Sequence, residues 1–131
     1  MSDKPLSPRM ENAIEHMIRN NNKLVRFPGG YWAREGWHSW NGPCWGTPTI
    51  EALVKRGFAE YTVWKDGRGG KFPIEVSLNK EKMWRRAYGQ RLYEQGYTGQ
   101  EAYESAQAAE YLPDVDPIES ADDEVSYRRD A

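Results

Sequence analysis

The sequence predicts an α+β fold in which helices pack on a small antiparallel sheet that carries a β-hairpin. Along 72–78, apolar residues alternate with proline and polar residues, which is typical of a strand with one buried face. Because proline has no backbone N–H to donate, Pro73 indicates a strand at the edge of the sheet. An earlier extended run, 59–64, is separated from this strand by the glycine-rich segment 65–71, which predicts the tip of a hairpin.

The N-terminal part predicts one helix followed by two short strands. Ser7 can cap a helix through its side chain, and Pro8 is favoured in the first turn. The apolar face of this helix repeats at helical spacing and consists of Met10, Ala13, Ile14, Met17 and Ile18. The asparagines at 20–22 are expected to end it. Strands over 23–27 and 31–34 follow, joined by a Pro-Gly-Gly turn.

The segment 35–46 is rich in tryptophan and glycine and has no pattern that predicts a helix or a strand. Its three tryptophans, Trp37, Trp40 and Trp45, could join Trp32 in a pocket that binds a base or another ligand by stacking. Filling of the hydrophobic core is the alternative that we expect, because large aromatic side chains supply most of the volume that a small core needs.

Two further helices are predicted from their ends. The first spans 48–56, because Thr47 and the proline after it repeat the pattern of a cap followed by a first-turn proline, and Gly57 stands where glycine commonly ends a helix. The second begins after Asn79, which can cap it, and ends at Gly96. Its apolar face is formed by Met83, Trp84, Ala87, Tyr88 and Leu92.

The C-terminal region predicts a last helix and an acidic tail. Thr98 and Glu101 match a capping box, which begins a helix expected to run to Leu112. Residues 114–131 are acidic and nearly lack apolar periodicity, so we expect a mobile tail. Charge is divided along the chain: residues 1–91 carry 16 Lys and Arg against 9 Asp and Glu, whereas 92–131 carry 2 against 11.

The composition favours a binding protein over an enzyme. The 131 residues fit one domain, and the single Cys44 excludes an internal disulfide, as expected for a cytoplasmic protein. No apolar run approaches the length of a membrane span, so no membrane association is expected. His16, His38 and Cys44 are too few and too unevenly spaced for a zinc site, and no metalloprotease, serine hydrolase or phosphate-binding-loop motif is present. We expect neither a cofactor nor catalysis.

The order of predicted elements resembles a winged helix-turn-helix domain. The densest match covers 47–78, where Thr-Pro-Thr-Ile-Glu-Ala-Leu-Val-Lys-Arg-Gly-Phe-Ala-Glu-Tyr is similar to a recognition helix and the first strand of a wing. The tip at 66–71 and the return strand at 72–78 follow in register. Members of this family usually place two helices before the recognition helix. Here 23–46 occupies that place, either with a short irregular helix or as a degenerate helix-turn-helix.

The resemblance implies a winged-helix-like domain over 7–79, C-terminal helices over 80–112 packed on it, and an acidic tail over 113–131. It also implies a small DNA-binding regulator of the kind found in phages and mobile elements, which uses the 48–56 helix and the 65–71 wing. The residues expected to contact nucleic acid are Thr49, Lys55, Arg56, Lys65, Arg68, Lys71, Arg85 and Arg86.

A second function stays open. The same scaffold could serve as a phage-type inhibitor or adaptor that binds a host protein through its acidic C-terminal region. The residues expected to make that contact are Glu101, Glu104, Glu110, Asp114 and Asp116. Such a surface could occupy a basic, DNA-binding groove of the host protein. The sequence leaves the oligomeric state open, a homodimer included.

Overall fold

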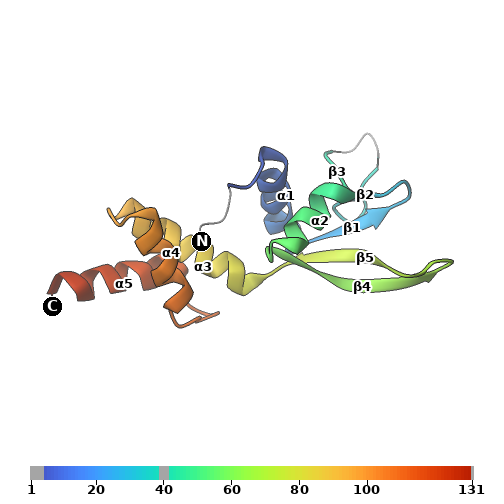
Figure 1. The fold of residues 1–131 in the computed structure, drawn as a ribbon. Helices are drawn as coiled ribbons and strands as arrows, with labels where there is room; N and C mark the ends of the chain where they lie inside the picture. Colours follow the sequence, from blue (N-terminus) through green and yellow to red (C-terminus); the bar gives the residue numbers. More distant parts are fainter. Residues whose placement is uncertain (1–4, 39–41, 131) are drawn as a thin grey trace. The chain divides into compact units, whose positions relative to one another are not determined.

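The computed structural model describes residues 5–38 and 42–130, and in them the α+β class is confirmed (Figure 1). The described residues contain five helices and one five-stranded antiparallel sheet with the strand order β3-β2-β1-β5-β4. The elements are α1 (Pro8–Arg19), β1 (Lys23–Phe27), β2 (Tyr31–Ala33), β3 (Trp45–Gly46), α2 (Thr47–Lys55), β4 (Ala59–Gly67), β5 (Gly70–Leu78), α3 (Lys80–Glu94), α4 (Gly99–Ala108) and α5 (Pro117–Asp130). They form two compact units, a sheet unit over 5–79 and a helical unit from residue 80 onward.

Helix α1 begins and ends as its sequence predicts. The Ser7 hydroxyl oxygen accepts a hydrogen bond from the backbone N–H of Met10 at 3.2 Å, and Pro8 is the first helical residue. Four of the five expected apolar residues are buried, whereas Ile18 is exposed. After the cap at Asn20, the next two asparagines have positive φ values of 61° and 62°, a conformation that asparagine tolerates better than most residues.

The region between α1 and α2 forms strands. Its described residues contain β1, β2 and β3 and no helix, so the second helix that the resemblance calls for is replaced by a β-hairpin and a two-residue strand. Trp32 pairs with Trp45 across β2 and β3, and both side chains are only 1% exposed. For these two tryptophans the expected core filling is confirmed. Trp37 is half-buried, and Trp40 lies outside the described residues.

Helix α2 is capped differently from the prediction. The N-cap residue is Gly46, so the assignment of Thr47 as the cap is wrong. The Thr47 hydroxyl instead donates to the carbonyl oxygen of Gly30 at 2.9 Å and accepts from the indole N–H of Trp32 at 3.3 Å. It therefore satisfies a buried indole, a stronger requirement than an exposed helix end. Gly57 has a φ of +82° and follows the helix as predicted.

Strands β4 and β5 form the predicted hairpin, which is longer than expected. Pairing extends to Lys65 with Phe72 and to Gly67 with Gly70, so only residues 68 and 69 form the turn. Strand β5 lies between β1 and β4, so the prediction of an edge strand from Pro73 is wrong. The proline is tolerated because β1 pairs with β5 only at residues 75–77, which leaves Pro73 beyond that stretch.

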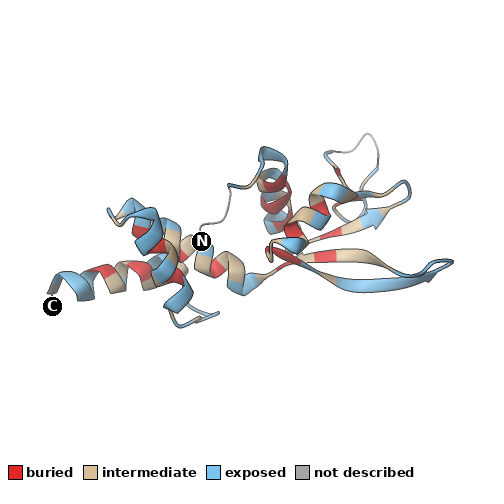
Figure 2. Cartoon of the chain, in the orientation of Figure 1, coloured by how far each residue is buried: buried red, intermediate tan, exposed pale blue. Residues whose placement is uncertain are grey.

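The helical unit consists of α3, α4 and α5 around its own core. The capping box of α4 is confirmed: the Thr98 hydroxyl accepts from the backbone N–H of Glu101 at 3.1 Å, and the Glu101 carboxylate accepts from the backbone N–H of Thr98 at 3.0 Å. Helix α4 ends at Ala108, earlier than predicted. The buried core residues, coloured red in Figure 2, are Trp84, Tyr88, Leu92, Ala102, Ala106, Ala121 and Val125.

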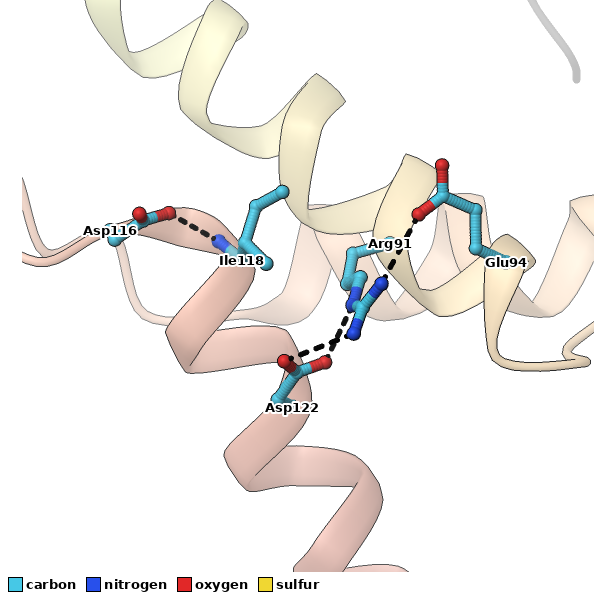
Figure 3. A network of polar contacts seen from close by, with 5 residues as sticks. All are labelled: Arg91, Glu94, Asp116, Ile118 and Asp122. Atoms are coloured by element: carbon cyan, nitrogen blue, oxygen red, sulfur yellow. Dashed lines mark hydrogen bonds and ion pairs between the residues drawn. The ribbon is translucent and has the colours of Figure 1, made fainter.

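Most of the segment predicted to be an unstructured acidic tail is helix α5. Ala121 and Val125, four positions apart, are 0% and 4% exposed and join the core of the helical unit. Arg91 of α3 donates to both carboxylate oxygens of Asp122, at 2.7 Å and 3.3 Å (Figure 3). The Asp116 carboxylate accepts from the backbone N–H of Ile118 at 2.8 Å, at the start of the helix. The packing of Ala121 and Val125 and the Arg91–Asp122 ion pair are tertiary contacts, and they supply the stabilisation that the composition of the segment does not.

Candidate nucleic-acid interface

The β4–β5 hairpin presents the most exposed part of the sheet unit. Every residue over 62–71 is exposed, and the outer half of the ribbon is pale blue in Figure 2. The reason is its pairing, because β1 reaches only residues 75–77 of β5. The hairpin residues beyond this stretch are paired with each other, through a register that shifts near Val63 and Trp64. A two-stranded ribbon of this kind can enter a groove of a nucleic acid.

Three of the predicted cations lie together at the end of this hairpin. Lys65 and Lys71 lie on the two strands, and Arg68 lies in the turn. In the part of the chain that the structure describes, none of the three forms an ion pair, although Asp66 is paired with Lys71 in the strand register. The hairpin end therefore carries a net positive charge whose side chains face solvent.

The structure adds Arg26, which the sequence analysis missed. Its guanidinium lies 5.1 Å from the centre of the Phe72 ring, and its side chain is exposed. The same ring packs against the backbone of Gly67, where a Cβ atom would come within 2.7 Å of it. Glycine at this position therefore lets the ring lie across the strand. Only the pairing of β1 with β5 brings Arg26 to the hairpin, and no sequence pattern predicts that pairing.

Beside the hairpin, where β1 and β5 part, the surface holds an open groove of about 830 Å³. Its apolar lining includes Val25, Phe27 and Ile74. Lys23 lies 3.3 Å from the Glu75 carboxylate and 3.6 Å from the Glu35 carboxylate. The single Lys23 charge therefore offsets one of these two carboxylate charges, so the three side chains together carry a net charge of −1.

The Glu75 carboxylate is held in its charged form. The Thr62 hydroxyl donates to it at 2.6 Å, and this hydrogen bond, followed by the contacts with Lys23, lowers the pKa of Glu75. The Lys23 ammonium is also held in its charged form, because its hydrogen bond with Glu75 and the charge of Glu35 raise the pKa of Lys23. The Glu75 carboxylate and the Lys23 ammonium therefore both stay charged over the physiological range.

The predicted contacts on α2 are less accessible than those on the hairpin. Thr49 is half-buried, and the half-buried Arg56 places its guanidinium 5.7 Å from the centre of the Phe58 ring. Lys55 is exposed and forms no ion pair within the described residues. One face of this helix packs into the core through Ile50 and Leu53, both 0% exposed.

Arg85 and Arg86 lie on α3 in the helical unit. The Arg85 guanidinium donates to the carbonyl oxygens of Ala106 and Ala109, each at 2.7 Å, and forms an ion pair with Glu81 at 3.1 Å. It thereby satisfies carbonyl groups at the C-terminal end of α4, a structural use that the sequence does not reveal. Arg86 is exposed.

The five acidic residues of the alternative function have different surroundings. Glu101 belongs to the capping box, where the backbone N–H of Thr98 lowers the pKa of its carboxyl group. Glu104 accepts from the Gln100 amide at 2.8 Å, and Asp116, just before α5, accepts from the backbone N–H of Ile118. Two exposed residues, Glu110 and Asp114, have no ion-pair partner among the residues described.

Comparisons with protein-family models, curated proteins and solved structures find no match to this chain. Within residues 5–38 and 42–130, no three His, Cys, Asp or Glu side chains gather as metal ligands. In the same residues no helix has both the length and the apolar character needed to cross a membrane.

Proposed function

We propose that the chain is a small nucleic-acid-binding regulator of winged-helix-like type whose main contact is the β4–β5 hairpin. The observation that carries the proposal is the group of three exposed cations, Lys65, Arg68 and Lys71, none of them paired within the described residues. A phosphate backbone offers the opposite charge at regular spacing, and the release of its counterions drives such binding. Glycines in and beside the turn leave room for backbone amides to approach phosphate oxygens.

Helix α2 has a secondary role in this proposal. A winged-helix protein normally reads bases with the helix that precedes its wing. Here Arg56 lies beside an aromatic ring and Thr49 is half-buried, so Lys55 is the helix residue best placed to contact a phosphate. We therefore expect binding with modest sequence preference, in which phosphate contacts by the hairpin supply most of the affinity.

The test compares two triple variants of the full chain. The first, Lys65→Ala, Arg68→Ala and Lys71→Ala, removes the hairpin cations. The second removes the exposed cations Arg19, Lys80 and Arg129, which lie elsewhere and form no ion pair within the described residues, and it changes the net charge equally. Fluorescence anisotropy with a labelled DNA duplex at low salt measures the affinity.

The hairpin variant should bind at least about tenfold more weakly than the wild type, because up to three phosphate contacts are lost. The control variant should lose less than about threefold, which reflects the change in net charge alone. Equal losses in the two variants would contradict the hairpin as the site. Absence of wild-type binding to DNA or RNA at low salt would refute the proposed function.

A further inference from the structure

The helical unit carries a second surface with the opposite character. An open groove of about 780 Å³ lies over α3, α4 and α5. Trp84, Tyr88, Leu112 and Tyr127 supply its aromatic and apolar lining. The acidic side chains Glu104, Glu110, Asp123 and Glu124 also line it, whereas Arg128 is its only cation among the residues described.

The aromatic lining is held in place by the fold. The rings of Trp84 and Tyr88 stack at 5.4 Å between centroids with an interplanar angle of 20°, and the Trp84 indole N–H donates to the carbonyl oxygen of Val115 at 2.9 Å. Leu112 and Tyr127, in contrast, are 38% and 73% exposed. A fixed aromatic base with exposed apolar side chains beside it is typical of a surface that binds a partner.

The negative charge of the groove is not neutralised by the cation that lines it. Arg128 is used internally, because it pairs with Glu124 at 3.0 Å, donates to the Ser105 hydroxyl at 3.1 Å and lies 5.1 Å from the centre of the Tyr97 ring. The carboxylates of Glu110 and Asp123 have no cationic partner in the described part of the chain. Such a groove repels phosphates and attracts cations.

We infer that this groove binds a cationic segment of a protein partner, in which arginine side chains alternate with apolar ones. Arginine suits this groove for two reasons. Its planar guanidinium pairs with carboxylates such as Glu110 and Asp123, and it also stacks on an exposed ring such as Tyr127. Apolar side chains of the segment cover Leu112. The inference does not depend on nucleic-acid binding, since the hairpin cations belong to the other unit.

Calorimetric titration of the full chain with synthetic peptides tests this inference. The probe is a 15-residue peptide of arginine, leucine and alanine, and its counterparts replace every arginine by glutamate or every leucine by serine. Glu110→Gln with Asp123→Asn removes the groove charges and keeps the side-chain shapes. The matched control, Glu94→Gln with Glu119→Gln, removes two exposed charges of the same unit that do not line the groove.

The arginine–leucine peptide should bind, and both counterparts should bind at least about tenfold more weakly, since each lacks one of the two complementary features. The groove variant should weaken binding by about fivefold at low salt, and the control variant should leave it unchanged. Tyr127→Ala, which changes no charge at a largely exposed position, should weaken binding by about threefold. Equal binding of the arginine and glutamate peptides, or equal losses in the groove and control variants, would overturn the inference.

Discussion

Replacing Val125 by alanine should loosen α5 from the helical unit. Val125 is 4% exposed, and the substitution removes two methyl groups from the core. At about 0.8 kcal/mol for each buried methylene-sized group, the lost transfer free energy is about 1.6 kcal/mol, and the cavity left behind adds to it. Alanine recovers about 0.5 kcal/mol through its higher helix propensity. We expect the free energy that protects α5 against local opening to fall by about 1–2 kcal/mol.

Native-state hydrogen exchange of the backbone amides in α3 and α5 measures this change for each helix. The matched control is Ser126→Ala, which alters the neighbouring exposed residue of the same helix and should change protection by less than about 0.5 kcal/mol. If the wild-type amides of α5 exchange at the rates of an unstructured peptide, the packing of Val125 and Ala121 against α3 is refuted. Equal protection in Val125→Ala and wild type would refute the expected fall in the free energy that protects α5 against local opening.

Three further predictions concern single contacts. Gly89→Val should lower the free energy of unfolding by about 1–3 kcal/mol in thermal denaturation, because even a Cβ at this position would lie 3.2 Å from the Cβ of Ala106 and the valine methyls add to that crowding. Thr98→Ala should cost about 1 kcal/mol through loss of the capping box, and Thr98→Ser should restore most of it. Thr62→Val should raise the pKa of Glu75, followed by NMR titration of the carboxyl carbon. In the wild type this pKa lies below the ordinary value of 4.5, so the carboxylate stabilises the fold at neutral pH and this contribution disappears as pH falls through the folded-state pKa.

The elements that the sequence predicts well are those with local determinants. The cap at Ser7, the capping box at Thr98 and the glycine after α2 each depend on residues within one turn of a helix. The β4–β5 hairpin is predicted for a similar reason, because its two strands are joined by a short glycine-rich turn. Such features require no knowledge of which distant segments pack together.

The elements that the sequence analysis missed depend on distant partners. Strand β3 has two residues and exists through its pairing with β2, so it has too short a pattern to detect. Over 117–129 of α5, where burial is described, only Ala121 and Val125 are buried, among many charged residues, and the composition predicts disorder. The pairing of Arg91 with Asp122 spans 31 positions in the sequence (Figure 3). A local pattern carries no signal for such a contact.

The residues of the candidate site also fall into those that the local sequence predicts and those that depend on distant partners. The cations at the end of the hairpin, Lys65, Arg68 and Lys71, can be predicted because they flank its turn. Arg26 joins them through the pairing of β1 with β5, and Arg85 is directed to carbonyl groups at the end of α4, neither of which a charge count reveals. The sequence therefore predicts where charge is concentrated and does not predict which charges the fold itself uses.

The salt dependence of DNA binding tests the central claim most directly. Each phosphate that the protein neutralises on duplex DNA contributes about 0.9 to the slope of log K against log salt concentration. If Arg68 and Lys71 contact phosphates, the variant Arg68→Ala with Lys71→Ala should show a slope smaller by about two than that of the wild type. An unchanged slope, with or without a change in affinity, would contradict phosphate binding by the hairpin.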